Sequence, residues 1–221
     1  RHAKATTVDL VTSLPEAELD RVCDSCPLWS IRDVVAHHVH FLGAYLRDEV
    51  PSAVGTALTT ADEATRIAAG VERDAWTQSG VEQRRDLPFD RVLTEWAELA
   101  DSMAPEGANC TVDITMHLYD IAETTGSVVD DPRLTADALA AYFYFFLSPR
   151  LEETGHAFDL RCIDTGAVLA SGPPAAMVSG TAYELLRAVG GRRSRDDADA
   201  NLDWHDTPEA DRNLLSVYGW R

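Results

Sequence analysis

Two histidine-containing segments of this chain carry the residues best suited to bind a metal ion. The first runs from Trp29 to His38 and reads WSIRDVVAHH, and the second runs from Thr111 to Asp120 and reads TVDITMHLYD. Together they offer imidazoles from one segment and a carboxylate with an imidazole from the other. This is the ligand set of a mononuclear metal site with an open position, so the sequence predicts metal-assisted chemistry if the two segments meet.

Helical spacing places the donors of the second segment on one face. Asp113 and His117 are four residues apart, so both side chains project from the same side of an α-helix, about one turn apart. At about 100° per residue Asp120 joins the same stripe, which lies inside the apolar face of the predicted helix. A carboxylate buried there is costly unless it is paired or bound to a metal. The alternative is that Asp113 only hydrogen-bonds His117, or that both lie at a hydrated end of a bundle.

Three histidines of the first segment, His37, His38 and His40, follow a strong helix start. Ser30 and Asp33 resemble a capping box with Asp in place of Glu or Gln, which predicts that a helix begins directly after Ser30. On that helix the apolar face passes through His38, with His37 at its edge and His40 pointing away to solvent. Helical phase therefore favours His38, and at least one of His37 and His38 is expected to be only a core residue or a support for a ligand.

These segments, together with SGTAYELLRAVGGRRS near the C-terminus, resemble the mycothiol-dependent maleylpyruvate isomerase family within the DinB-like metal-binding bundles. The resemblance covers most of the chain. It implies that the first metal ligand is the histidine eight residues after Trp29, which is His37 rather than His38. It also implies Asp113 and His117 as the other two ligands, although the family generally carries Glu where this chain has Asp113.

The resemblance implies a divalent metal, in the first place Zn²⁺ with Ni²⁺ or Fe²⁺ as alternatives, and mycothiol or a similar thiol as cosubstrate. The activity implied is that of an isomerase or a thiol S-transferase acting on a small anionic or electrophilic substrate. Asp120 is expected to orient His117 by accepting a hydrogen bond from it. Arg192 corresponds to an arginine that handles the anionic substrate in the family, and a guanidinium donates two parallel hydrogen bonds to a carboxylate.

The composition excludes some classes of partner. The net charge of −18 argues against binding to nucleic acid or to an anionic membrane, because both need clustered cations. No apolar run approaches the about 20 residues that span a bilayer, and no secretory signal pattern opens the sequence. We therefore expect a cytoplasmic protein whose partners are a small substrate and a thiol. A non-catalytic helical bundle that binds a metal or a small ligand is the alternative to an enzyme.

The expected fold is mainly α, a DinB-like up-and-down four-helix bundle with a small C-terminal α+β lobe. The predicted domains are residues 1–154 for the bundle and 155–221 for the lobe. Proline, glycine and asparagine separate the predicted helices, which are Lys4–Ser13, Ile31–Arg47, Ala61–Gly70, Phe89–Met103, Thr111–Thr125 and Thr135–Ser148.

The lobe is predicted from a change of pattern after Gly155. The segment AFDLRCIDTGAVLASG alternates around residues 164–166, which predicts a β-hairpin, and a helix is expected from about Ser179 to Val189.

Near the other end of the chain, Cys23 and Cys26 form a CDSC pair without a second pair at zinc-site spacing. We expect these two cysteines to be structural or incidental.

Overall fold

The computed structural model describes residues 2–103, 108–172 and 176–220, and within them the chain is mainly helical with small sheets, as predicted. It divides into two compact units, one made of Arg1–Val54 and Gly70–Asp130 and the other of Gly55–Ala69 and Asp131–Arg221. Compactness alone does not show which segments fold independently. The domain boundary between residues 154 and 155 therefore stays a prediction.

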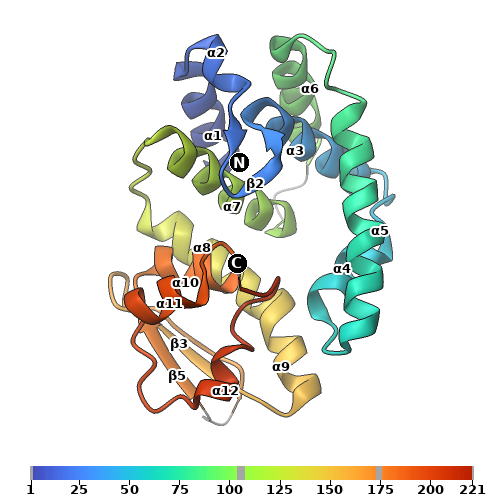
Figure 1. Cartoon of the computed structure of the whole chain (residues 1–221). Coiled ribbons are helices and arrows are strands. Elements are labelled where there is room, and N and C mark those ends of the chain that lie inside the picture. Colours follow the sequence, from blue (N-terminus) through green and yellow to red (C-terminus); the bar gives the residue numbers. More distant parts are fainter. Residues whose placement is uncertain (1, 104–107, 173–175, 221) are drawn as a thin grey trace. The chain divides into compact units, whose positions relative to one another are not determined.

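The first unit contains a helical bundle (Figure 1). Its helices are α1 (His2–Ser13), α2 (Glu16–Leu19), α3 (Ile31–Leu46), α6 (Phe89–Asp101) and α7 (Ala108–Thr125). Helix α3 packs against α6 and α7, and α1 packs against α7. The bundle core is therefore enclosed by α1, α3, α6 and α7, with α3 and α7 as neighbours.

Helix α3 begins at the capping box that the sequence predicts. The Ser30 hydroxyl accepts the backbone N–H of Asp33 at 3.2 Å, and the Asp33 carboxylate accepts the backbone N–H of Ser30 at 3.1 Å. The Asp33 carboxylate also pairs with Arg85 at 3.3 Å. The first contact satisfies the backbone N–H of Asp33 in the first turn of α3, and the reciprocal pair fixes where the helix begins.

A short hairpin that the sequence did not predict precedes α3. Strand β1 (Val22–Cys23) pairs antiparallel with β2 (Cys26–Ser30) across a turn of two residues. The backbone N–H of Asp24 in this turn donates to the Thr124 hydroxyl of α7 at 3.0 Å. Strand β1 is too short to give an alternating pattern, so only its tertiary contact with α7 makes this hairpin recognisable.

The helix predicted over Ala61–Gly70 is wrong in its extent. The structure instead has α4 (Ser52–Thr59) and α5 (Glu63–Glu82), and the limits of the two units fall within these helices. Gly70 does not end α5, because one glycine inside a helix costs only about 1 kcal/mol and most of its neighbours are good helix formers. Among the described residues, no helix combines the length and the apolar composition that a membrane span requires.

The second unit combines helices with a small sheet. Strands β3 (Phe158–Cys162) and β4 (Val168–Ala170) form the predicted antiparallel hairpin, and β5 (Ala176–Gly180) pairs with β3 in parallel. Helix α10 packs against α8 and β5. The helices of this unit are α8 (Pro132–Tyr142), the π-helical turn η1 (Phe143–Leu147), α9 (Ser148–Thr154), α10 (Ala182–Val189), α11 (Arg195–Asn201) and α12 (Glu209–Arg212).

Three predicted helix limits in this unit need correction. The helix expected to end at Ser148 does not end there, because α8 ends at Tyr142, η1 follows and α9 begins at Ser148, with the proline that was expected to stop the helix in its first turn. The helix expected to begin at Thr135 begins at Pro132, because the Asp131 carboxylate caps it and proline fits the first helical position. The helix expected to begin at Ser179 begins only after Thr181, whose hydroxyl accepts the backbone N–H of Glu184. Ser179 belongs to β5 instead, and this third strand was not predicted.

Candidate metal centre

Helices α3 and α7 bring the predicted metal ligands together. The Nε2 atom of His37 on α3 lies 3.0 Å from Oδ2 of Asp113 on α7. The Nε2 atom of His117, one turn further along α7, lies 3.7 Å from Oδ1 of the same carboxylate. The centroids of the His37 and His117 rings are 5.3 Å apart. Two imidazoles from different helices therefore meet the two oxygens of one carboxylate.

His38 also belongs to this centre. Its Nδ1 atom lies 3.4 Å from Asp113 Oδ2, and its side chain is 0% exposed. Its ring stacks on Trp96 with 5.2 Å between centroids. Burial lowers the pKa of His38 to about 4, despite the opposing effect of Asp113, so the ring is neutral near pH 7. Both adjacent histidines of α3 thus reach Asp113, and His38 is the deeper of the two.

His40 is not the solvated residue that helical phase predicts. It does point away from Asp113, but α5 covers that side of α3. The His40 ring packs on Trp76 with 4.5 Å between centroids. A Cβ atom at Gly80 would overlap the same ring, so this glycine permits the close approach of α5. Burial, followed by the charge of Arg84, lowers the pKa of His40 to about 4.

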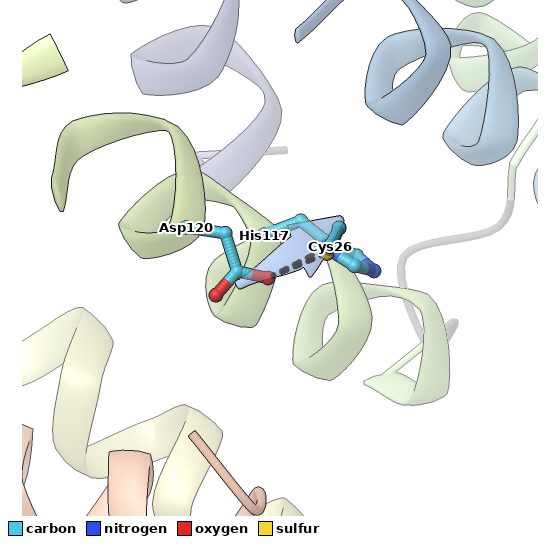
Figure 2. Close-up of side chains that lie close together, drawn as sticks. All are labelled: Cys26, His117 and Asp120. Atoms are coloured by element: carbon cyan, nitrogen blue, oxygen red, sulfur yellow. Dashed lines mark hydrogen bonds and ion pairs between the residues drawn. The ribbon is translucent and has the colours of Figure 1, made fainter. Parts of the chain in front are cut away.

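Asp120 and Cys26 surround the other nitrogen of His117. Nδ1 of His117 lies 2.8 Å from Oδ2 of Asp120, whose side chain is 0% exposed. The thiol of Cys26 donates to the same carboxylate oxygen at 3.4 Å and lies 3.6 Å from His117 Nδ1 (Figure 2). The sequence predicted Asp120 at this place but not Cys26. The CDSC motif lies just before Trp29, but no local pattern in it places Cys26 against α7.

Trp29 holds the two imidazoles in place. Its ring lies 4.9 Å from the His37 ring and 6.1 Å from the His117 ring, measured between centroids. Its indole N–H donates to the Gln78 side-chain oxygen at 2.9 Å, and the Gln78 amide donates to Glu82 at 3.0 Å. The indole is therefore anchored to α5 while its faces limit how far both imidazoles can turn.

When no metal is bound, the electrostatics of the centre favour an ion pair between protonated His117 and the Asp113 carboxylate. Burial alone would raise the pKa of Asp113, but the charges of His37 and His117 hold it well below its usual value. Burial alone would lower the pKa of His117, but Cys26, Asp113 and the hydrogen bond to Asp120 raise it well above its usual value. A cation that binds here would displace a proton from His117 and supply the positive charge in its place.

The donors form two adjoining groups. Among the residues that the structure describes, His37, His38 and Asp113 place ligand atoms within 4.8 Å of one another, and so do Cys26, His117 and Asp120. The contact between Asp113 and His117 joins the groups. Two imidazoles and a carboxylate are suitable ligands for a borderline cation such as Zn²⁺. The Asp113 side chain is 27% exposed whereas His37 and His117 are buried, so Asp113 is the most accessible to solvent of the three.

Arg192 belongs to the second unit. Gly190 and Gly191 end α10 as predicted, and Gly191 adopts a φ of 65°, which favours glycine. The Arg192 guanidinium donates to the Gly190 carbonyl at 3.2 Å and lies 5.7 Å from the centre of the Tyr218 ring. Its role in handling an anionic substrate stays a prediction.

Residues 1–122 match a sequence model described as mycothiol maleylpyruvate isomerase N-terminal domain. This match covers more than half of the chain and includes every residue of the candidate metal centre. No curated protein matches the sequence. Among solved structures, the chain is similar to one described as the crystal structure of the mycothiol-dependent maleylpyruvate isomerase. The identity is 14%, the match covers 87% of this chain and 86% of that chain, and the TM-score is 0.47.

Proposed function

This chain belongs to the mycothiol maleylpyruvate isomerase N-terminal domain family, and on that premise we propose that it is a metal-dependent, thiol-dependent isomerase. Family membership confirms the resemblance recognised from the sequence. The proposal is carried by one observation, the convergence of His37 and His117 on the two oxygens of Asp113. The proposed substrate is small and electrophilic or anionic, and the proposed cosubstrate is mycothiol or a similar thiol.

We propose His37, Asp113 and His117 as the metal ligands, with His38 as a supporting core residue. Family membership favours His37, and its contact with Asp113 is shorter than that of His38, at 3.0 Å against 3.4 Å. His38 is instead held in the core by its stack on Trp96. Zn²⁺ suits the donor set best, and Ni²⁺ and Fe²⁺ are the alternatives.

When bound, the ion supplies a positive charge that favours the thiolate form of a thiol at neutral pH. The protein residues prepare the site for this role. Asp120 accepts the Nδ1–H of His117, which fixes the tautomer and leaves Nε2 directed at the ligand position. Trp29 shields the imidazoles on one side, and Asp113 is the most accessible to solvent of the three proposed ligands.

The proposed reaction uses the thiol as a reversible nucleophile. Its sulfur adds to an activated carbon of a conjugated substrate, so the former double bond can rotate as a single bond. Elimination then re-forms the double bond and returns the thiol unchanged. Arg192 is proposed to bind a substrate carboxylate.

We also propose a cytoplasmic location, because low-molecular-weight thiols keep that compartment reducing. An S-transferase, in which the carbon–sulfur bond is kept, is the closest alternative activity.

Metal stoichiometry tests the ligand assignment. The purified protein should bind an equimolar amount of Zn²⁺, and His37→Ala, Asp113→Ala and His117→Ala should each lose most of it. Asp9→Asn, which changes an exposed carboxylate of α1, is the control and should bind Zn²⁺ as the parent does. Full stoichiometry in all three ligand variants would show that the assignment is wrong.

A thiol titration then separates an enzyme from a binding protein. Replacing Zn²⁺ by Co²⁺ gives the centre an absorption spectrum that changes when sulfur enters the coordination sphere. A spectrum that shifts on addition of a low-molecular-weight thiol supports the thiol-dependent enzyme. Tight metal binding without any response to thiol supports the non-catalytic helical bundle instead.

A further inference from the structure

The thiols of Cys23 and Cys26 lie beside the candidate metal centre and have no part in the proposed chemistry. They flank the turn of the β1–β2 hairpin and are direct partners in its antiparallel pairing. Directly paired residues of antiparallel strands have Cα atoms about 4.5–5.5 Å apart and side chains on the same face. A disulfide needs Cα atoms about 4.4–6.8 Å apart. Both residues are free thiols, so the hairpin holds a reduced pair that is already in register for a disulfide.

The two thiols differ in access to solvent. Cys23 is 0% exposed, whereas Cys26 is half-buried. Burial, together with nearby Cys26 and Asp120, raises the pKa of Cys23 to about 12. Because of the difference in exposure, an external reagent reaches Cys26 first. Cys23, which is paired directly with Cys26, is placed to react with it in a second step.

Cys26 connects this pair to the metal centre. Its thiol donates a hydrogen bond to Asp120 Oδ2, the same oxygen that contacts Nδ1 of His117. A disulfide has no S–H hydrogen and cannot make this bond. Oxidation of the pair would therefore change the partners of the carboxylate that orients a proposed metal ligand.

We propose that Cys23 and Cys26 form a reversible disulfide switch whose oxidant is the disulfide form of a low-molecular-weight thiol. The sulfur of Cys26 attacks one sulfur of that disulfide, its S–S bond breaks, and one thiol leaves with the Cys26 proton. The sulfur of Cys23 then attacks Cys26 in the mixed disulfide, and a second thiol leaves with the Cys23 proton. The cysteines lose two electrons and two protons, and the incoming disulfide gains both.

Thiol counting on the metal-free full-length protein tests the first part of this proposal. Glutathione disulfide is the probe, and the reaction is stopped with acid before the remaining thiols are alkylated and the mass is measured. The parent has four cysteines and should lose two alkylatable thiols, retain no glutathione, and yield a peptide with Cys23 joined to Cys26. Cys23→Ser should retain one glutathione on Cys26, and Cys23→Ala serves if serine unfolds the buried position.

Two further variants control this experiment. Cys26→Ser should leave Cys23 reduced, because the buried thiol has lost its route to the reagent. Cys162→Ser removes a buried cysteine of the second unit and should behave as the parent. A parent that keeps its thiol count, or that ends with glutathione retained on Cys26 as in Cys23→Ser, overturns the proposal.

The effect on the centre is measured by NMR of the labelled imidazoles, with the His117 signals assigned from His117→Gln. Oxidation of the parent at constant pH should shift these signals, and dithiothreitol should restore them. The same treatment should leave them in place in Cys26→Ser. A disulfide that forms without moving the His117 signals refutes the switch. Neither readout needs a metal or a substrate, so failure here is distinct from failure of the proposed enzyme activity.

Discussion

The metal-free protein should lose stability on acidification, and replacing His38 should remove a large part of this loss. Burial lowers the pKa of His38 from 6.5 to about 4 in the folded protein. Between these values the unfolded chain binds a proton at His38 and the folded protein does not. The free energy of unfolding therefore falls as the pH falls from 6.5 towards 4 and is restored as the pH rises. At about 1.36 kcal/mol per pKa unit, the full loss is about 3 kcal/mol.

Urea unfolding of the metal-free protein between about pH 7 and about pH 4 measures this loss. The parent should lose about 3 kcal/mol more over this range than His38→Asn, which lacks the titrating ring. His40 and the other titrating groups remain in both proteins and largely cancel in the comparison. His2→Asn, which removes an exposed histidine of α1, should follow the parent. Equal pH dependence of the parent and His38→Asn would refute the assignment of this loss to His38.

Two further pairs of variants test the surroundings of the centre. Asp120→Asn should weaken Zn²⁺ binding about 10- to 100-fold, because the carboxylate that orients a ligand is lost, and Asp9→Asn should not. Competition with a chelator measures both affinities, and equal values would contradict the orienting role. Gly80→Ala should destabilise the protein, because the new methyl group would overlap the His40 ring. Gly70→Ala in the same helix meets open space and should stabilise it by up to about 1 kcal/mol, so a stabilised Gly80→Ala would contradict this packing.

The parts of the centre that depend on local rules could be predicted from the sequence. The capping box of Ser30 and Asp33 fixes the first turn of α3, and with it the phase of its histidines. Spacing of four residues puts Asp113 and His117 on one face of α7 whatever surrounds that helix. Asp120 follows at three further residues and meets His117 for the same reason. These relations lie within single helices, so no knowledge of the tertiary fold is needed.

The parts that depend on contacts between distant segments could not be predicted. His40 is covered because α5 continues past Gly70, and no local signal sets the length of that helix. Cys26 reaches Asp120 only because the hairpin docks on α7 through Thr124. The choice between His37 and His38 has the same origin, because both rings reach Asp113 once α3 and α7 are packed together.

Because the proposed ligands come from two helices, an ion bound by them would cross-link these helices. His37 on α3 and Asp113 on α7 are 76 residues apart in the sequence, so a cation held by both would close a long loop of the chain. A ligand that binds only the folded form at 100 times its dissociation constant adds about 2.7 kcal/mol to the free energy of unfolding. Scarcity of the metal would then lower the amount of folded protein as well as the proposed catalytic activity.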